Sequence, residues 1–199
     1  VVDAIKKIKA EVGATVISFV DAKEAILLDL ADYKISYPVN EQLKFFMVAD
    51  RFMFNNGEFE DYEDMYAEFD KYLAQALVEV EKKAEPFAVE FAKKHWNDEM
   101  HYFVGAGNQW GATYSYAMCY WEEQLWLKTK SISSNEFFHG MFEIVTKETP
   151  VTIYIGEDAQ RPLSERVANF IPRICENYTI IDSKDYELKG ISEKYRKHL

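Results

Sequence analysis

Long apolar runs are missing from this chain of 199 residues. No stretch approaches the roughly 18 consecutive apolar residues that a membrane-spanning helix requires, and no charged segment followed by an apolar one opens the sequence. Low-complexity segments are missing as well. These absences predict a soluble, cytoplasmic protein that has no membrane partner.

Basic residues are too few to dominate any surface. The chain has 23 Lys and Arg against 34 Asp and Glu, which gives a formal net charge of −11. Nucleic-acid binding needs clustered Lys and Arg that neutralise phosphates, so this composition argues against a nucleic-acid partner. An anionic ligand would have to be held locally, by backbone N–H groups and hydroxyls.

Cysteine is nearly absent, and the histidines are scattered. Cys119 and Cys175 lie far apart and form no C-x-x-C pair, so we expect both thiols to be reduced, buried and inert. We also expect no metal site and no cofactor, because the histidines show no spacing typical of metal ligands. The histidines are His95, His101, His139 and His198.

The residues that are present describe a globular α/β protein. Hydrophobic residues make up 48% of the chain and aromatic residues 16%, enough for one sizeable core, or for one domain and part of another. The first forty residues alternate helical and extended patterns, which is typical of a parallel α/β sheet. The expected elements are a helix at 2–12 ended by Gly13, a strand at 15–20, a helix at 25–31 and a strand at 33–37.

Helical patterns then dominate up to residue 96. A helix is expected at 39–56, rich in Phe and Met between Phe45 and Phe54; this stripe indicates either core or a subunit interface. A long helix follows at 61–83 with an acidic, solvated face. Pro86 should break or restart it before a helix at 87–96.

Residues 100–145 hold the most informative pattern. A short apolar strand ends at Gly105, and Gly105-Ala106-Gly107 permits a tight turn into a helix that Gly111 would let pack close to the sheet. The spacing G-x-G-x-x-x-G is one residue longer than the dinucleotide fingerprint, so we do not predict NAD binding. The turn is either a plain strand-to-helix connection or a set of free N–H groups that bind an anion or a sugar.

The remaining chain continues the α/β pattern. A strand is expected at 151–155, a helix at 163–175 with Pro162 in its first turn and Pro172 kinking or ending it, and a strand at 179–182.

A second set of residues carries a family resemblance. The aromatic helix ends near Glu123, and the box Glu136-Phe137-Phe138-His139-Gly140 follows a short extended run at 129–134. A later segment has the pattern G-x-D-x-x-R…E-R, with Gly156, Asp158, Arg161, Glu165 and Arg166. In order and spacing these residues resemble the SIS (sugar isomerase) family of phosphosugar-binding proteins. Within that family they are similar to the fructoselysine-6-phosphate deglycases and to the isomerase half of glucosamine-6-phosphate synthase.

The resemblance implies an α/β fold of flavodoxin-like type, a three-layer α-β-α sandwich around a parallel sheet. It implies the C-terminal part of a first SIS domain at 1–56, a helical connector at 57–97 and a second SIS domain, incomplete at its end, at 98–199. In the family a Ser/Thr-rich phosphate loop precedes the helix that opens this chain, and a further helical segment follows its end. We therefore expect an internal fragment that is inactive alone.

For activity, the resemblance implies a deglycase that cleaves a 6-phosphorylated Amadori product, such as fructoselysine 6-phosphate, to glucose 6-phosphate and an amine. An aldose–ketose or amino-sugar phosphate isomerase is the first alternative. A phosphosugar sensor without catalysis is the second, and we disfavour it because both acid/base positions hold competent residues and no DNA-binding helix-turn-helix is present. The resemblance also implies a homodimer or higher oligomer with a shared site.

The roles of single residues follow from the same resemblance. Glu123, partly desolvated beside Trp121, would move a proton between C1 and C2 of the sugar, and His139, reaching a neighbouring subunit's pocket, would open the ring or help the amine leave. Taken without the resemblance, Glu123 is a solvated helix carboxylate and His139 a helix-start or core histidine. Ser133 and Ser134 could equally cap the following segment or border the sugar pocket. The implied substrate-binding residues are Ser133, Ser134, Glu136, Gly105, Gly107 and Asn108.

Overall fold

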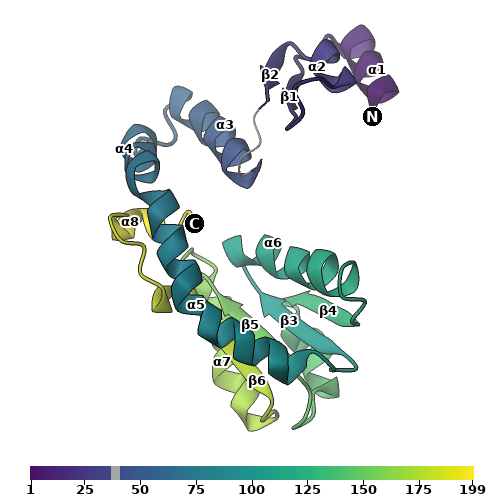
Figure 1. Cartoon of the computed structure of the whole chain (residues 1–199), viewed down its shortest axis with the longest axis vertical. Coiled ribbons are helices and arrows are strands. Elements are labelled where there is room, and N and C mark those ends of the chain that lie inside the picture. The colour runs from purple at the N-terminus through teal and green to yellow at the C-terminus, as the bar shows by residue number, and fades with distance from the viewer. Residues whose placement is uncertain (37–40) are drawn as a thin grey trace. The chain divides into compact units, whose positions relative to one another are not determined.

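The computed structural model describes residues 1–36 and 41–199, which form two compact units, Val1–Glu63 and Asp64–Leu199 (Figure 1). Each unit carries its own parallel sheet flanked by helices, as the α/β prediction requires. The predicted division at 1–56, 57–97 and 98–199 stays a prediction. In the described part of the chain, every helix is too short or too polar to traverse a lipid bilayer.

The first unit follows the alternating pattern of its sequence. The first helix ends at Gly13, whose φ of 65° gives the left-handed cap that glycine adopts at no steric cost. Two short strands pair in parallel, with Ile17 opposite Tyr33. The last residue of the strand predicted at 33–37 and the first two residues of the helix predicted at 39–56 lie outside the described residues. The elements are α1 (Val2–Val12), β1 (Ile17–Phe19), α2 (Ile26–Leu30), β2 (Tyr33–Ile35) and α3 (Glu41–Asn55).

The aromatic stripe of α3 does not form a core. Phe45 is 53% exposed, Phe46 56% and Phe52 59%, so the expectation that this stripe is buried is wrong for the chain by itself. The Phe45 ring contacts Phe19 of β1, with ring centroids 4.6 Å apart, but most of the Phe and Met side chains of the stripe stay exposed. The alternative, a subunit interface, stays a prediction.

The second unit begins with a nearly continuous run of helix. Pro86 was expected to break this run, yet α5 continues through it, so this expectation is wrong. One missing N–H costs a 22-residue helix a single hydrogen bond, and packing of residues such as Ala76 and His95 holds the rest. The elements are α4 (Tyr62–Glu68), the π-helical η1 (Phe69–Leu73) and α5 (Ala74–His95).

A four-stranded parallel sheet forms the centre of the second unit, with strand order β4-β3-β5-β6. The predicted strand at 151–155 matches β5 residue for residue, and the helix predicted at 163–175 ends early, at Phe170, before Pro172. The strands are β3 (His101–Gly105), β4 (Thr129–Ser133), β5 (Val151–Ile155) and β6 (Tyr178–Asp182). The other elements are α6 (Asn108–Ser115), the π-helical η2 (Tyr116–Glu122), the 3₁₀ segments η3 (Phe137–His139), η4 (Met141–Ile144), η5 (Ile171–Arg173) and η6 (Ser183–Asp185), and the helices α7 (Arg161–Phe170) and α8 (Glu193–Arg196).

Both faces of this sheet are covered, because successive side chains of a strand point to opposite sides. Phe103 packs on one face against Ala117 and Trp121 of η2. Its neighbour Val104 packs on the other face in the main core, which includes Phe137. Figure 1 shows α5 running along the sheet, and Phe91 of that helix joins the first cluster. The three-layer arrangement is therefore as predicted.

The turn after β3 is held by a carboxylate from the loop that follows β5, the strand next to β3. Asp158 Oδ2 accepts a hydrogen bond from the Asn108 N–H at 3.0 Å, and Asp158 Oδ1 accepts one from the Gln160 N–H at 2.7 Å. These N–H groups lie at the starts of α6 and α7, where a negative charge is stabilised by the helix dipole. The Asn108 N–H is thus engaged within the chain, which favours the plain strand-to-helix connection of the two alternatives for this turn.

The glycines of this turn differ in their roles. Gly107 has a φ of 57°, and a Cβ there would overlap the Asp158 carboxylate. A Cβ on Gly105 would overlap the hydroxyl of Thr113, so Gly105 is the position that lets α6 approach the sheet. Gly111 was expected to do this, but a Cβ there would meet nothing within 4 Å, so that expectation is wrong.

Two ion pairs close the carboxyl end of the sheet. Arg161 binds Asp182, the last residue of β6, through two N–H···O bonds, and Arg196 binds Glu157 just beyond β5. The Arg161 guanidinium lowers the pKa of the Asp182 carboxyl, and Arg196 lowers that of Glu157. The chain segments after β5 and β6 are thereby tied to the C-terminal residues.

We predict that Gly107→Ala destabilises the chain by about 1–2 kcal/mol or more, because alanine resists the left-handed backbone and its Cβ displaces Asp158. Gly111→Ala is the matched control, and it should be neutral or stabilising by about 0.5–1 kcal/mol, since helical alanine is favoured over glycine. Urea unfolding of the two variants measures both effects. Equal stability changes in the two variants would contradict this account of the turn.

We also predict acid sensitivity from the Arg161–Asp182 pair. The pKa of Asp182 is lowered in the folded state, so its stabilisation is complete above the ordinary value of 3.8 and is lost as the pH falls through the folded value. The free energy of unfolding should therefore decrease between about pH 5 and pH 2. Asp182→Asn should be less stable at neutral pH and show a shallower decrease. An identical slope in both proteins, measured by urea titration at each pH, would refute this assignment.

Candidate functional site

The predicted substrate-binding residues gather at the carboxyl edge of β3 and β4. Gly105 and Ser133, the last residues of these strands, are register partners. The Ser134 N–H donates to the Gly105 carbonyl at 2.8 Å, and Gly107 and Asn108 follow β3 in the adjoining turn. This edge adjoins the point where the strand order reverses about β3, the usual place for a ligand in an open parallel sheet.

Two of these residues have their polar groups engaged within the chain. The Ser134 side chain is 1% exposed, and its Oγ lies 2.8 Å from Ser164 Oγ, also buried. Asn108 Nδ2 donates to the Lys197 carbonyl at 2.7 Å. Ser134 and Asn108 therefore brace the edge here, whereas Ser133 is half-buried and Gly107 is exposed.

Glu123 lies at the far end of the helix that starts at this edge. The helix and its π-helical extension run back across the sheet, and the neighbouring Glu122 accepts a hydrogen bond from Thr129, the first residue of β4, at 2.6 Å. Glu123 is thus near the amino edge of the sheet, on the face covered by Ala117 and Trp121. Its side chain is exposed, so the expected partial desolvation is not present in the single chain.

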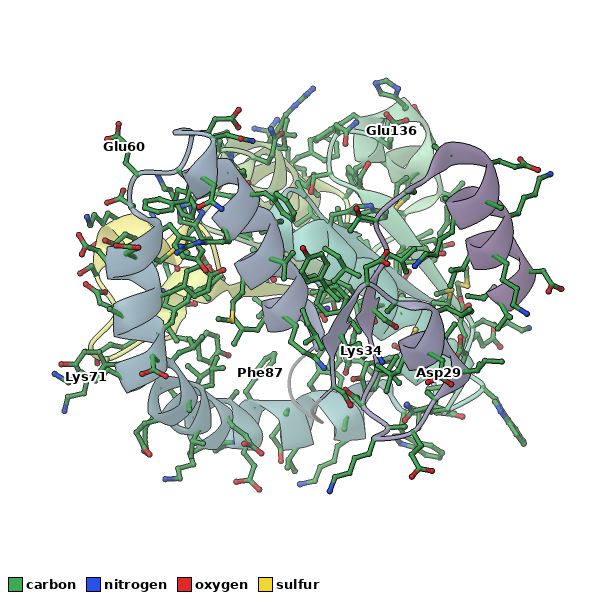
Figure 2. The ribbon with its side chains drawn as sticks, turned by 90° about the horizontal axis from the view of Figure 1, so that it is seen from above. Asp29, Lys34, Glu60, Lys71, Phe87 and Glu136 are labelled. Atoms are coloured by element: carbon green, nitrogen blue, oxygen red, sulfur yellow. The ribbon has the colours of Figure 1, made fainter. Side chains whose placement is uncertain are left out.

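His139 lies after β4, at the end of η3. Its side chain is 72% exposed, and its Nδ1 is 3.6 Å from Glu136 Oε2. Figure 2 labels Glu136, whose side chain points away from the ribbon and is 53% exposed. The anchor of this segment is Phe137, which is fully buried on the face of the sheet opposite to η2. The segment forms 3₁₀ turns, where an opening helix was expected.

Glu123 and His139 of one chain therefore flank opposite faces of the same sheet. The helix that carries Glu123 packs on the face formed by Phe103, and the segment that carries His139 packs on the face formed by Val104. Both side chains are exposed, and the sheet separates the elements that carry them. One chain alone does not bring the two groups into a common cleft.

The arginines of the resembling segment have distinct contacts. Arg161 binds Asp182 and Glu165 and also donates to the Gly156 carbonyl, so it braces the fold. The Arg166 guanidinium lies over the Phe138 ring, 4.2 Å from its centroid. An open cavity of about 550 Å³ is lined in part by Phe138, Phe142 and Arg166. Phe138 is the residue that precedes His139 in the sequence.

A cluster of His95, Asp98 and His101 was missed in the sequence. Asp98 Oδ2 lies 2.7 Å from His95 Nδ1 and 2.9 Å from His101 Nδ1. The two histidines are 1% and 0% exposed, and burial lowers the pKa of His101 to about 4, so this ring is neutral at neutral pH. The spacing H-x-x-D-x-x-H in the sequence could have revealed this cluster, but its residues belong to the end of α5, the connection and the start of β3.

The two thiols are as expected in part, with Cys175 buried and Cys119 half-buried.

No protein-family model matches the chain, but known proteins resemble it. It is 33% identical to the fructosamine deglycase FrlB of Bacillus subtilis over 112 residues, which are 56% of this chain and 34% of that protein. It is 34% identical to the fructoselysine 6-phosphate deglycase of Escherichia coli K12 over 83 residues, 42% of this chain and 24% of that protein. The chain thus matches about a third or less of these relatives' length.

The fold has solved counterparts. A Bacillus subtilis protein assigned as a phosphosugar isomerase superposes with a TM-score of 0.88 at 25% identity, over 100% of this chain and 62% of that one. This likeness extends over both units, whereas the sequence matches cover about half of the chain. The chain is therefore a homologue of the fructosamine deglycases and has the SIS fold of the phosphosugar isomerases.

Proposed function

We propose that this chain is part of a deglycase that cleaves a 6-phosphorylated Amadori product, such as fructoselysine 6-phosphate, into glucose 6-phosphate and an amine. The observation that carries the proposal is the similarity to FrlB over 112 residues. The box from Glu136 to Gly140 and the carboxylate of Glu123 are the residues that would perform the chemistry. The chain matches 34% of the length of FrlB, so the whole reaction is proposed for the complete enzyme and not for this part alone.

The chemistry needs two acid/base groups. Moving one proton from C1 to C2 of the ketosamine, and the nitrogen proton to O2, converts it into an imine at C1, which water hydrolyses to the aldehyde and the free amine. Glu123 would take the proton from C1 and return it at C2, and His139 would open the ring or protonate the departing nitrogen. A carboxylate and an imidazole suit these steps near neutral pH, provided that the carboxylate is partly desolvated.

The two groups would meet only when two copies of the chain combine. In one chain Glu123 and His139 flank opposite faces of the sheet, so a cleft that contains both needs Glu123 from one protomer and His139 from another. Contact with a second protomer would also remove water from Glu123, which is exposed in the single chain. The proposed enzyme is therefore a homodimer or larger oligomer with shared sites.

The surface next to Glu123 fits such a contact. Leu125 is 59% exposed and Trp126 is 88% exposed, although both are apolar. Trp126 also adopts a φ of 59°, a conformation that costs a non-glycine residue about 1–2 kcal/mol. Exposed apolar side chains that gather at one place are typical of protein interfaces. These two residues would cover the rim of the shared cleft.

We predict that Glu123→Gln and His139→Ala each lower the rate of glucose 6-phosphate release by about 10²–10⁴. The assay uses the natural full-length protein that contains this chain, with phosphorylated Amadori compounds as substrates. Glu122→Gln is the matched control, because it alters the neighbouring carboxylate and should leave most of the activity. Sugar-phosphate interconversion without amine release would favour an isomerase, and binding without turnover would favour a sensor; either result would contradict the deglycase proposal.

We further predict complementation between the two inactive variants. In a mixed dimer of Glu123→Gln and His139→Ala chains, one of the two shared sites is intact, so random mixing should restore about a quarter of wild-type activity. Each variant alone, treated in the same way, is the control. A mixture as inactive as its components, with mixed dimers demonstrated by differential tags, would refute the shared site.

A further inference from the structure

The geometry points to a binding site for a first-row divalent transition ion, with Zn²⁺ as the test case, formed by His95, Asp98 and His101. One ligand atom from each of these residues lies within 4.8 Å of the other two. Two imidazole nitrogens and one carboxylate oxygen are ligands that suit such an ion better than Mg²⁺ or Ca²⁺, which prefer oxygen alone. The site lies on the sheet face that carries Phe103, apart from the carboxyl edge of the sheet, where the predicted substrate-binding residues gather.

The cluster is held in place by three elements. His95 is the last residue of α5, His101 is the first residue of β3, and Asp98 lies in the connection between them. The rings of Phe91, Phe103 and Trp121 pack around His101, with centroids 5.7, 4.4 and 4.8 Å from it. Ligands fixed in this way lose little conformational freedom when an ion binds.

The hydrogen bond behind His101 is of the kind that supports a metal ligand. His101 Nε2 lies 2.8 Å from Thr152 Oγ1, a buried hydroxyl of β5. Histidines that bind metals through one nitrogen usually bond through the other to a fixed oxygen. Thr152 would therefore orient the His101 ring so that its Nδ1 points at the ion.

The ring of His95 is buried with one of its two nitrogens unpaired by any described residue. His95 Nε2 is buried and, within residues 1–36 and 41–199, has no hydrogen-bond partner. Leaving such an atom unpaired is unfavourable, and a phenylalanine at this position would avoid that cost. The contact that justifies a histidine here is the one made by Nδ1, on the side that faces Asp98.

An ion would take the place of the two hydrogen bonds between Asp98 and the imidazole rings. A tetrahedral ion with bonds of about 2.0–2.1 Å separates its ligand atoms by about 3.3 Å, so Asp98 must retract by about half an ångström. An imidazole that binds the ion through Nδ1 carries its single proton on Nε2, and that of His101 would be donated to Thr152 Oγ1. Asp98, 17% exposed, would be the route to solvent and leave room for a water as fourth ligand.

The test is the binding of Zn²⁺ and Co²⁺ to the full chain after treatment with a chelator. We expect one ion per chain by calorimetry, a higher melting temperature with Zn²⁺ but not with Mg²⁺, and a visible absorption band from Co²⁺. The control His139→Ala removes the exposed pair of His139 and Glu136 and should leave these results unchanged. Absence of saturable binding by the wild-type chain would overturn the proposal.

Two variants locate the ion. Asp98→Asn should abolish the Co²⁺ band, and Thr152→Val, which keeps the volume of the side chain, should weaken affinity about 10–100-fold. The circular dichroism spectrum of each variant shows whether it folds. A folded Asp98→Asn chain that binds Zn²⁺ as tightly as wild type would also overturn the proposal, because the ion would then lie elsewhere.

Discussion

The parallel pairing of β3 with β4 constrains all that follows it in the second unit. Parallel neighbours require the chain to return across one face of the sheet before the next strand begins. The return between β3 and β4 is the helix that ends near Glu123, and it covers the face formed by Phe103. The chain after β4 then covers the other face, anchored by Phe137. Glu123 and His139 are thus separated by the sheet itself, although only a short segment lies between them.

This separation gives the exposed surfaces of the chain a common explanation. Glu123, Trp126 and His139 all face solvent, where the carboxylate of the proposed mechanism and an apolar indole are poorly placed. A second protomer that covers the rim near Trp126 would desolvate the carboxylate and supply the imidazole. At the carboxyl edge of the sheet, Asp158 ties the starts of two helices together, because its carboxylate accepts from the N–H groups of Asn108 and Gln160.

The sequence predicted the local structure well, and the long-range contacts poorly. A nearly continuous apolar run located β5 without error, and Gly13 ended α1 as expected. Asp158 was recognised only as part of a motif, because the turn that it holds lies far away in the chain. Gly111 was assigned the role of Gly105, since the pattern shows where glycines occur and not what a Cβ would meet. The exposed face of α3 could not be foreseen either, because periodicity shows that a face is apolar but not whether anything covers it.

The candidate site shows the same limit. The acid/base residues were found through family resemblance, whereas their placement on opposite faces required the sheet topology. The most direct test is a short thiol cross-linker applied to chains that carry Glu123→Cys mixed with differently tagged chains that carry His139→Cys, all in a Cys119→Ser background. The account predicts a cross-link between the two tagged chains in the mixture and none in either chain alone. A link that forms within single chains carrying both substitutions, and not between chains, would contradict it.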